Sequence, residues 1–298
     1  MSKYLETIHF IREQFPGKDF VPLHEPKFNG NEKSYLLETI DSTYVSSVGA
    51  FVDKFEEMMA DLSGTSKTVA VVNGTSALQV ALRLVGVNNG DEVLTQALTF
   101  VATVNAILYN SAQPIFIDVD LDTMGLSPRA VATFLEEFGE IRDGFCFNKK
   151  TNKKIAACMP MHTFGFPVHL DELITICNKW NIPVVEDAAE SIGSEYKGVP
   201  TGSFGKLGVF SLNGNKIVTS GGGGVIVTND LELGTKAKHL TTTAKKPHPY
   251  EYVHDEIGYN FRMPNINAAL ACAQLEQLDD FLVDKRNLAF EYGKYFDK

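Results

Sequence analysis

The chain has 298 residues, 44% of them hydrophobic, which is enough to bury the core of one large domain and part of a second. Its formal net charge of −10 and its isoelectric point near 5.2 argue against nucleic acid as a main partner, but not against an anionic substrate bound in a local basic pocket. The first residues lack the apolar core of a secretory signal, and no apolar run has the length of a membrane span. These features predict a soluble, cytoplasmic protein.

The four cysteines show neither CxxC spacing nor a cysteine–histidine ligand pattern. Three of them lie in apolar surroundings, which favours small buried residues. We therefore expect no disulfide framework and no metal site at Cys146, Cys158, Cys177 and Cys272.

The middle of the chain alternates short β-branched segments with helical patterns. Helices are expected to begin near Ser76, Thr103, Pro128 and Leu170. This alternation is typical of an α/β protein with a mostly parallel sheet covered on both faces. The last two strands follow each other closely, which indicates a hairpin-like or antiparallel edge. The expected strands cover residues 68–72, 92–95, 113–118, 154–159, 183–186, 207–211 and 224–228.

The two ends of the chain have a different pattern from the middle. Residues 1–65 are expected to form helices and loops, and residues 245–250 an exposed loop. A long helix is expected to start near Pro264 and to run to the end without a C-terminal cap. We therefore predict a large domain over residues 1–235, with residues 236–298 as the start of a truncated C-terminal small domain.

Gly74, Thr75 and Ser76 lie where a strand gives way to a helix. The first N–H groups of a helix are unpaired and favour an anion, and the two hydroxyls add donors. The alternative is an ordinary Ser/Thr helix cap.

Asp187 ends an apolar strand, at the edge where open α/β sheets bind ligands. A carboxylate there can keep a pyridine nitrogen protonated. The alternative is a cap for the residues that follow.

Lys216 lies in a polar loop after a strand and before the glycine run 221–224, which lets backbone approach a ligand closely. A lysine amine can form an imine with an aldehyde and can then act as general base and acid. The alternative is a solvated surface charge, with the glycines as a flexible turn. The order of these residues does not match a nucleotide-triphosphate loop.

Phe100 follows a strand and can stack on a flat cofactor, although a place in the core is an alternative. A phosphate-binding helix start, a buried acid and a loop lysine are together what pyridoxal phosphate requires of a protein.

These residues resemble the DegT/DnrJ/EryC1/StrS family of sugar aminotransferases, which have the fold type I of pyridoxal-phosphate enzymes. Within the family the chain is most similar to the LegC-type enzymes, on the segments 254–270 and 273–278. LegC-type enzymes aminate nucleotide-linked 4-keto-6-deoxy sugars in pathways to sugars of the legionaminic and bacillosamine type. The other matching segments are 48–56, 73–78, 99–103, 114–118, 186–190, 210–216 and 258–264.

The resemblance implies catalytic roles for two residues: Lys216 as the Schiff-base lysine and Asp187 as the partner of the pyridine nitrogen. Glu190 would lie near the ring hydroxyl and Phe100 against the ring. Asn260 would reach the cofactor phosphate of a second subunit, so the resemblance implies a homodimer with shared active sites. The implied cofactor-binding set is Gly74, Thr75, Ser76, Phe100, Asp187, Glu190, Ser211, Lys216 and Asn260.

The expected function is transfer of an amino group from glutamate to a nucleotide-linked 4-keto-6-deoxy sugar, in a pathway of the legionaminic, bacillosamine or perosamine type. One alternative is a dehydratase of the same family, but dehydratases carry histidine in place of the Schiff-base lysine, so Lys216 argues against it. The other alternative is a truncated, non-catalytic relative.

Overall fold

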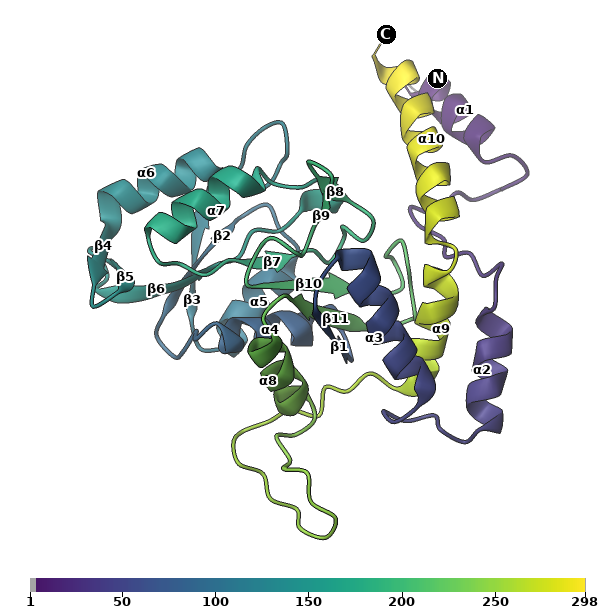
Figure 1. The fold of residues 1–298 in the computed structure, drawn as a ribbon. Helices are drawn as coiled ribbons and strands as arrows, with labels where there is room; N and C mark the ends of the chain where they lie inside the picture. The colour runs from purple at the N-terminus through teal and green to yellow at the C-terminus, as the bar shows by residue number, and fades with distance from the viewer. Residues whose placement is uncertain (1–3, 298) are drawn as a thin grey trace.

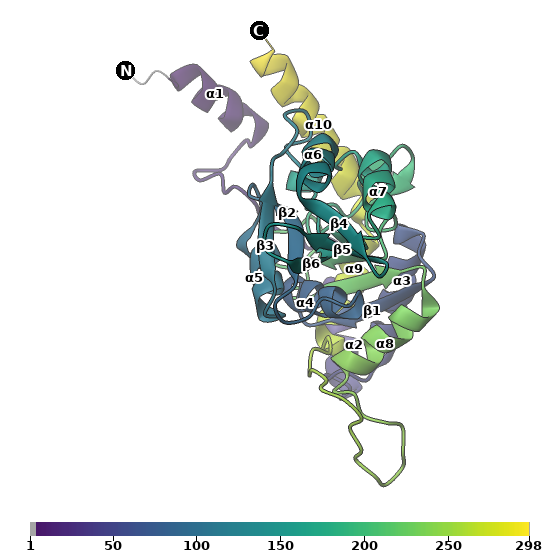
Figure 2. The ribbon, with the colours of Figure 1, turned by 90° about the vertical axis from the view of Figure 1, so that its left-hand side faces the viewer.

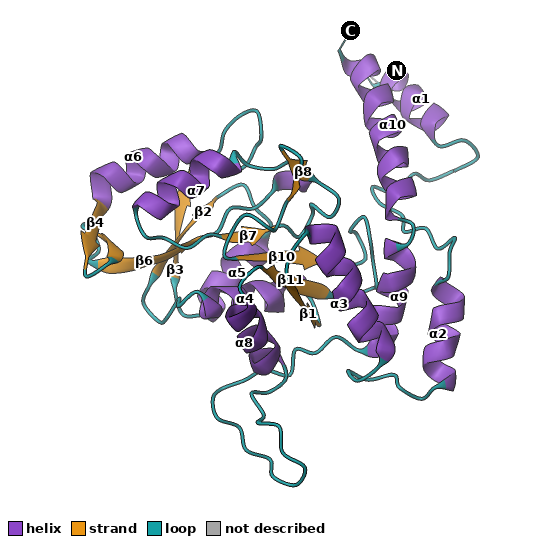
Figure 3. Cartoon of the chain, in the orientation of Figure 1, coloured by secondary structure: helices purple, strands orange, loops and turns teal. Residues whose placement is uncertain are grey.

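The computed structural model describes residues 4–297 and places a central set of strands between helices (Figures 1 and 3). The strands are β1 (Lys67–Val71), β2 (Glu92–Gln96), β3 (Gln113–Ile117), β4 (Gly139–Arg142), β5 (Phe145–Asn148), β6 (Lys153–Cys158), β7 (Val185–Asp187), β8 (Glu195–Tyr196), β9 (Val199–Pro200), β10 (Leu207–Ser211) and β11 (Gly224–Thr228). One sheet has the order β1-β11-β10-β7, another the order β3-β2-β6-β5-β4, and β8 pairs with β9. Parallel bridges from Cys158 to Val184 and from Met161 to Asp187 link the two larger sheets.

Helices surround these strands and supply the rest of the core. They are α1 (Leu5–Gln14), α2 (Glu32–Asp41), α3 (Ala50–Ser63), α4 (Gly74–Leu84), α5 (Val101–Tyr109), α6 (Pro128–Phe138), α7 (Leu170–Lys179), α8 (Leu231–Thr241), α9 (Asn265–Leu275) and α10 (Leu278–Phe296). None of the helices in the described part of the chain combines the length and the apolarity needed to cross a membrane. The expected cytoplasmic location stays a prediction.

Successive side chains of β11 point to opposite faces of its sheet and belong to two separate cores. Ile226 of β11 packs in one core with Ala81 of α4 and with residues of α8. Its neighbours Val225 and Val227 pack in another core with Phe55 of α3 and with residues of α9. Helices therefore cover both faces of this sheet, as the sequence predicts.

The seven expected strands all form, and the four expected helices of the central region begin within two residues of their expected starts. The pairing is more mixed than expected. β2 pairs in parallel with β3 and β6, and β7 with β10, whereas β11 is antiparallel to both of its neighbours. β11 lies inside the sheet and not at its edge, because β1 pairs with its second side.

The β4–β5 hairpin is absent from the sequence prediction. Its two turn residues, Asp143 and Gly144, have φ angles of 50° and 81°. An Asp-Gly pair is the usual signal for a two-residue hairpin turn that needs positive φ at both positions. The short strands on either side carried too little periodicity to be recognised.

The C-terminal region differs from the single helix that we expected. α9 ends at Leu275, and α10 begins at Leu278 after a break in which Gln277 has φ −108° and ψ 4°. In Figures 1 and 2, α10 and the loop after α8 project from opposite ends of the molecule. Phe10 of α1 stacks on Tyr295 of α10, with ring centroids 4.1 Å apart. The expected boundary after residue 235 falls inside α8, and the division into domains stays a prediction.

Candidate active site

A cavity of about 330 Å³ lies where β7 and β10 end and α4 and α5 begin. The carboxyl ends of neighbouring parallel strands meet at this edge, so residues far apart in the sequence face one space. The structure thus brings together seven of the nine predicted residues. The cavity is lined by Gly74, Thr75, Phe100, Asp187, Glu190, Ser211 and Lys216, together with Asn73, Leu78, Ala102, Met161, Ala189, Asn213 and Asn215.

The start of α4 presents free donors to this cavity. Asn73 is the N-cap residue, and its Oδ1 accepts the N–H of Ser76 at 2.8 Å. The N–H groups of Gly74 and Thr75 have no partner among the described residues, so they remain available to an anion. Because Asn73 makes the cap, the hydroxyls of Thr75 and Ser76 are not needed for it. The sequence prediction missed Asn73, although asparagine before a helix is a recognised cap signal.

Gly74 is required by a close approach of two chain segments. A Cβ on Gly74 would lie 2.9 Å from Cβ of Ser211 and 3.2 Å from its Oγ. Ser211 ends β10, is buried, and lines the same cavity. The helix start and this serine therefore form one continuous polar surface. Ser76 lies one residue beyond the lining.

Asp187 is buried at the end of β7, with a fractional exposure of 3%. Thr103 Oγ1 donates to its Oδ2 at 2.7 Å, and the N–H of Ala189 donates to its Oδ1 at 3.2 Å. Burial raises the pKa of Asp187, although the Thr103 hydrogen bond opposes that shift. The residues after Asp187 form turns and not a helix, so it does not cap one. The sequence analysis assigns no site role to Thr103, and the structure identifies it as an additional site residue.

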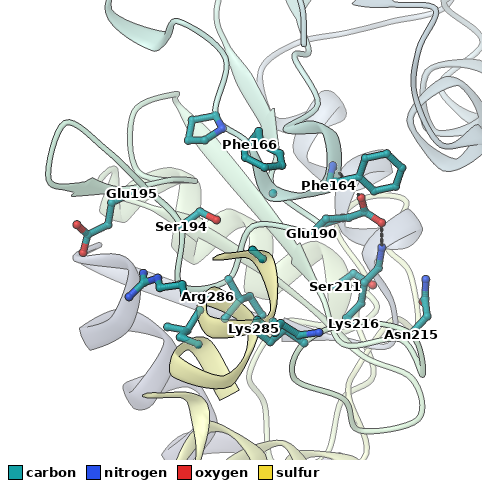
Figure 4. Close-up of a pocket in the computed structure, with 18 of the residues that line it drawn as sticks. Phe164, Phe166, Glu190, Ser194, Glu195, Ser211, Asn215, Lys216, Lys285 and Arg286 are labelled. Carbon is teal, nitrogen blue, oxygen red and sulfur yellow. Dashed lines mark hydrogen bonds and ion pairs between the residues drawn. The ribbon is translucent and has the colours of Figure 1, made fainter. Parts of the chain in front are cut away.

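Lys216 and Glu190 form an ion pair at the centre of the site. Lys216 Nζ lies 2.7 Å from Glu190 Oε1, and the lysine side chain is 12% exposed (Figure 4). The other carboxylate oxygen of Glu190 accepts the N–H of Phe164 at 3.2 Å. The lysine is therefore not a solvated surface charge. Its amine is held at the cavity by a partner that is itself fixed to the backbone.

Phe100 and Asn260, the two predicted residues still to be placed, lie in different surroundings. Phe100 is 68% exposed and lines the cavity as the N-cap residue of α5, so it does not belong to the core. Asn260 is exposed and lies outside the lining of the cavity, where its Oδ1 accepts from Arg262 Nε at 2.9 Å. Its expected role involves a second subunit and stays a prediction.

A buried histidine–glutamate pair lies on the other side of β7 and was missed from the sequence. His162 Nε2 and Glu186 Oε2 are 3.1 Å apart and both side chains are fully buried. Glu186 also accepts the N–H groups of Gly202, Phe204 and Gly205 at 2.7–2.8 Å. These four contacts fix the strand end that carries Asp187. Strand alternation was the available signal, because it places residues 186 and 187 on opposite faces.

A second, larger cavity of about 640 Å³ adjoins the first (Figure 4). The two share Ala189, Glu190, Ser211, Asn215 and Lys216 in their linings. The outer walls of the larger cavity come from the 164–167 segment and from α10. Lys216 therefore stands between an inner cavity that fits a ring and phosphate and an outer cavity open to a substrate.

The residues present fit pyridoxal phosphate. The unpaired N–H groups at Gly74 and Thr75 suit its phosphate, and the glycine leaves space beside Ser211 that a Cβ would fill. A buried carboxylate at Asp187 needs a positive partner, which the protonated ring nitrogen would be. Lys216 supplies an amine in the same cavity.

The α/β fold and this site define a class, the pyridoxal-phosphate-dependent aminotransferases of fold type I. The model of the DegT/DnrJ/EryC1/StrS aminotransferase family matches residues 26–298, and the chain belongs to that family. The predicted family, fold type and cofactor are thereby confirmed.

Known relatives agree with this assignment. The chain is 40% identical over 270 residues to EpsN of Bacillus subtilis, which is named a pyridoxal-phosphate-dependent aminotransferase. That match covers 91% of this chain and 67% of EpsN. The chain is also 40% identical over 275 residues to the GDP-perosamine synthase of Escherichia coli O157:H7. That match covers 92% of this chain and 71% of the relative. The chain thus spans about two thirds of the length of these relatives.

Solved structures of the same kind resemble the structure of this chain. The 3-amino-5-hydroxybenzoic acid synthase matches with a TM-score of 0.77 and 28% identity, over 88% of this chain and 64% of that one. An aminotransferase from Psychrobacter cryohalolentis matches with a TM-score of 0.76 and 30% identity, over the same shares.

Proposed function

We propose that the protein transfers an amino group from an amino acid, glutamate, to a nucleotide-linked 4-keto-6-deoxy sugar. The observation that carries this proposal is the convergence of Lys216, Asp187 and the start of α4 on one cavity. The similarity to GDP-perosamine synthases supports a sugar nucleotide as the amino acceptor. The open outer cavity next to Lys216 offers room for such a substrate.

In this proposal, the bound cofactor supplies a ring that withdraws electrons from the carbon whose proton is transferred. The Lys216 amine holds the cofactor. It then removes the proton from the carbon that bears the amino group of the donor, and in the second half of the reaction it delivers a proton to the former keto carbon of the sugar. Its ion pair with Glu190 keeps Nζ at the cavity before the cofactor binds.

Asp187 is proposed to hold a proton on the ring nitrogen. Burial makes an unpartnered charge at Asp187 unfavourable, and a cationic partner would remove that cost. Thr103 orients the carboxylate through Oδ2. Phe100 is proposed to stack on the ring. Gly74, Thr75, Ser76 and Ser211 are proposed to bind the phosphate.

The functional unit is proposed to be a homodimer. Asn260 does not line the cavity of its own chain, which is compatible with the expected role of reaching the phosphate in a partner subunit. Each dimer would then contain two sites with contributions from both chains.

The proposal is tested by incubating the cofactor-loaded protein with glutamate and a panel of nucleotide-linked 4-keto-6-deoxy sugars, and by measuring product masses. Formation of an amino sugar that depends on glutamate supports it. A protein that binds the cofactor but aminates none of these sugars would refute the proposed substrate class.

A further inference from the structure

Two cations on α10 line the outer cavity without an opposite charge to neutralise them. Lys285 and Arg286 make no ion pair with any residue in the described range 4–297. The adjacent acid, Asp284, lies 3.6 Å from Lys27 and is engaged there. Glu195 also lines the cavity, but it forms no ion pair with either cation. In a chain of net charge −10, an unpaired cation pair in a cavity marks a place for an anion.

The wall of the same cavity contributed by the 164–167 segment carries exposed aromatic rings. Phe164 is 82% exposed and Phe166 is 66% exposed. Phe164 has φ 52°, a conformation that is rare for a bulky residue, and its N–H is bound to Glu190. Such strained positions cluster at ligand sites, where the surrounding structure fixes them. Flat apolar surfaces of this kind suit a nucleobase or a sugar ring.

The cation pair and the catalytic lysine belong to one continuous space. In the view of Figure 4, Lys285 lies between Lys216 and Arg286, and the phenylalanines lie across the cavity from α10. The cavity of about 640 Å³ has the size of sites that hold ligands larger than an amino acid. A ligand there can present one end to Lys216 and an anionic group to α10.

We propose that Lys285 and Arg286 bind the diphosphate of a nucleoside-diphosphate-linked keto sugar, while the keto carbon faces Lys216. This inference rests on the proposed function and adds the subsite that selects the sugar nucleotide. A carboxylate of the amino donor is the other anion that such a site could hold. We favour the diphosphate for two reasons. Two adjacent cations match its charge, and a small aliphatic amino acid has no ring to pack against the exposed phenylalanines.

The direct test is calorimetric binding of GDP, UDP and inorganic pyrophosphate to the cofactor-loaded protein. The double variant Lys285→Ala/Arg286→Ala should weaken the affinity for both nucleotides by about 100-fold, on the basis of about tenfold for each charge-assisted contact. Lys294→Ala is the matched control, because it removes an exposed cation from the same helix outside the cavity. Equal nucleotide affinity in the double variant and the control would overturn the inference.

Kinetics separate the subsite from the proposed function. In the double variant, KM for the sugar nucleotide should rise by a similar factor, while the half-reaction with glutamate, followed by absorbance, stays unchanged. A loss confined to the glutamate half-reaction would assign the cations to the donor and refute the diphosphate. If the wild-type protein binds GDP through these cations but aminates no sugar nucleotide, the proposed function fails and the subsite stands. If amination proceeds with an unchanged KM in the double variant, the function stands and the subsite fails.

Discussion

Three carboxylates lie close together in the sequence at this site, and their surroundings give each a different chemistry. Glu186 is sealed in the interior by a histidine and three backbone N–H groups. Asp187 is equally buried, but within residues 4–297 only Thr103 and Ala189 donate hydrogen bonds to its carboxylate, so its charge is less well compensated. Glu190 is partly open and is paired with Lys216. Burial and the number of hydrogen-bond donors, more than residue type, therefore distinguish Glu186, a structural acid, from Asp187 and Glu190, which face the cavity.

The first prediction concerns Lys216. Lys216→Ala should keep the fold, because the side chain lies in a loop and contributes to an ion pair and not to a core. It should abolish the covalent trapping of cofactor by borohydride, since the bond to the amine can no longer form. Mass spectrometry of the trapped wild-type peptide checks this. Trapping at Lys206, which is 62% exposed near Asp230, would show that the assignment is wrong.

The second prediction concerns the charge of Asp187. In the cofactor-free protein, Asp187→Asn should raise the melting temperature near neutral pH, because it removes a buried charge of raised pKa. A raised folded-state pKa means that the native state binds the proton more tightly than the unfolded state does. The wild type therefore loses stability as pH rises through that pKa, and the gain from the substitution should shrink as pH falls below it.

With cofactor bound, the same substitution should be harmful, because it impairs catalysis. Asp187→Asn should lower turnover on the order of 10²-fold or more, as the loss of a preorganised electrostatic partner does in other enzymes. Melting curves across pH and steady-state kinetics provide the two measurements. Near-normal turnover would reduce Asp187 to a structural residue.

At the scale of elements, the site depends on how closely α4 approaches β10. No side chain fits between Gly74 and Ser211, so the helix start lies directly against the strand end. Asn73 then fixes the first turn by capping Ser76. The unpaired N–H groups at the helix start and the end of β10 at Ser211 therefore border the same cavity.

The third prediction tests this approach. Gly74→Ala should lower the affinity for pyridoxal phosphate by about tenfold or more, because the new Cβ, 2.9 Å from Cβ of Ser211, must displace one wall of the site. Fluorescence titration measures the affinity. Gly214→Ala is the control, since a Cβ there meets no atom within 4 Å. Equal affinities for the two variants would show that the close approach does not matter.

The sequence predicted the strands and most of the site because both depend on local signals. Apolar strands that end in Asp187 or precede Lys216 are visible in the sequence, as is a glycine at a helix start. Partners supplied by distant segments are not visible in this way. His162 meets Glu186 only because β6 and β7 lie side by side, and Thr103 meets Asp187 only through the placement of α5.

The interior position of β11 is a further example. All five of its residues are buried, yet an apolar run is equally compatible with a central strand and with a covered edge strand. The antiparallel pairing of β1 with β11 decides between them. In contrast, the Asp143-Gly144 turn was a local signal that could have been recognised.

On the scale of the whole molecule, α5, whose start lines the inner cavity, has apolar residues in contact with solvent. Phe100, Val101, Leu108 and Tyr109 are each between 51% and 68% exposed, and all lie on α5 or at its start. A second copy of the chain would cover apolar surface of this kind. The proposed dimer is therefore consistent with the exposed surface as well as with the position of Asn260.

The fourth prediction tests shared sites by mixing two inactive variants, Lys216→Ala and Asn260→Ala. In a mixed dimer, one site carries both substitutions and the other carries neither, so activity should return in part. Subunit exchange is verified independently by labelled chains. If exchange occurs and no activity returns, each site is built within a single chain.

The pairing of β1 with β11 also has a consequence for synthesis on the ribosome. β1 ends at Val71, whereas the strand that pairs with it, β11, begins only at Gly224. At roughly 5–20 residues per second, that interval is on the order of ten seconds. During this time an apolar strand has no neighbour to pair with, and neither Asp187 nor Lys216 is yet in place beside α4. The nascent chain thus acquires its ability to bind a cofactor late, and its early sheet segment needs protection from aggregation until then.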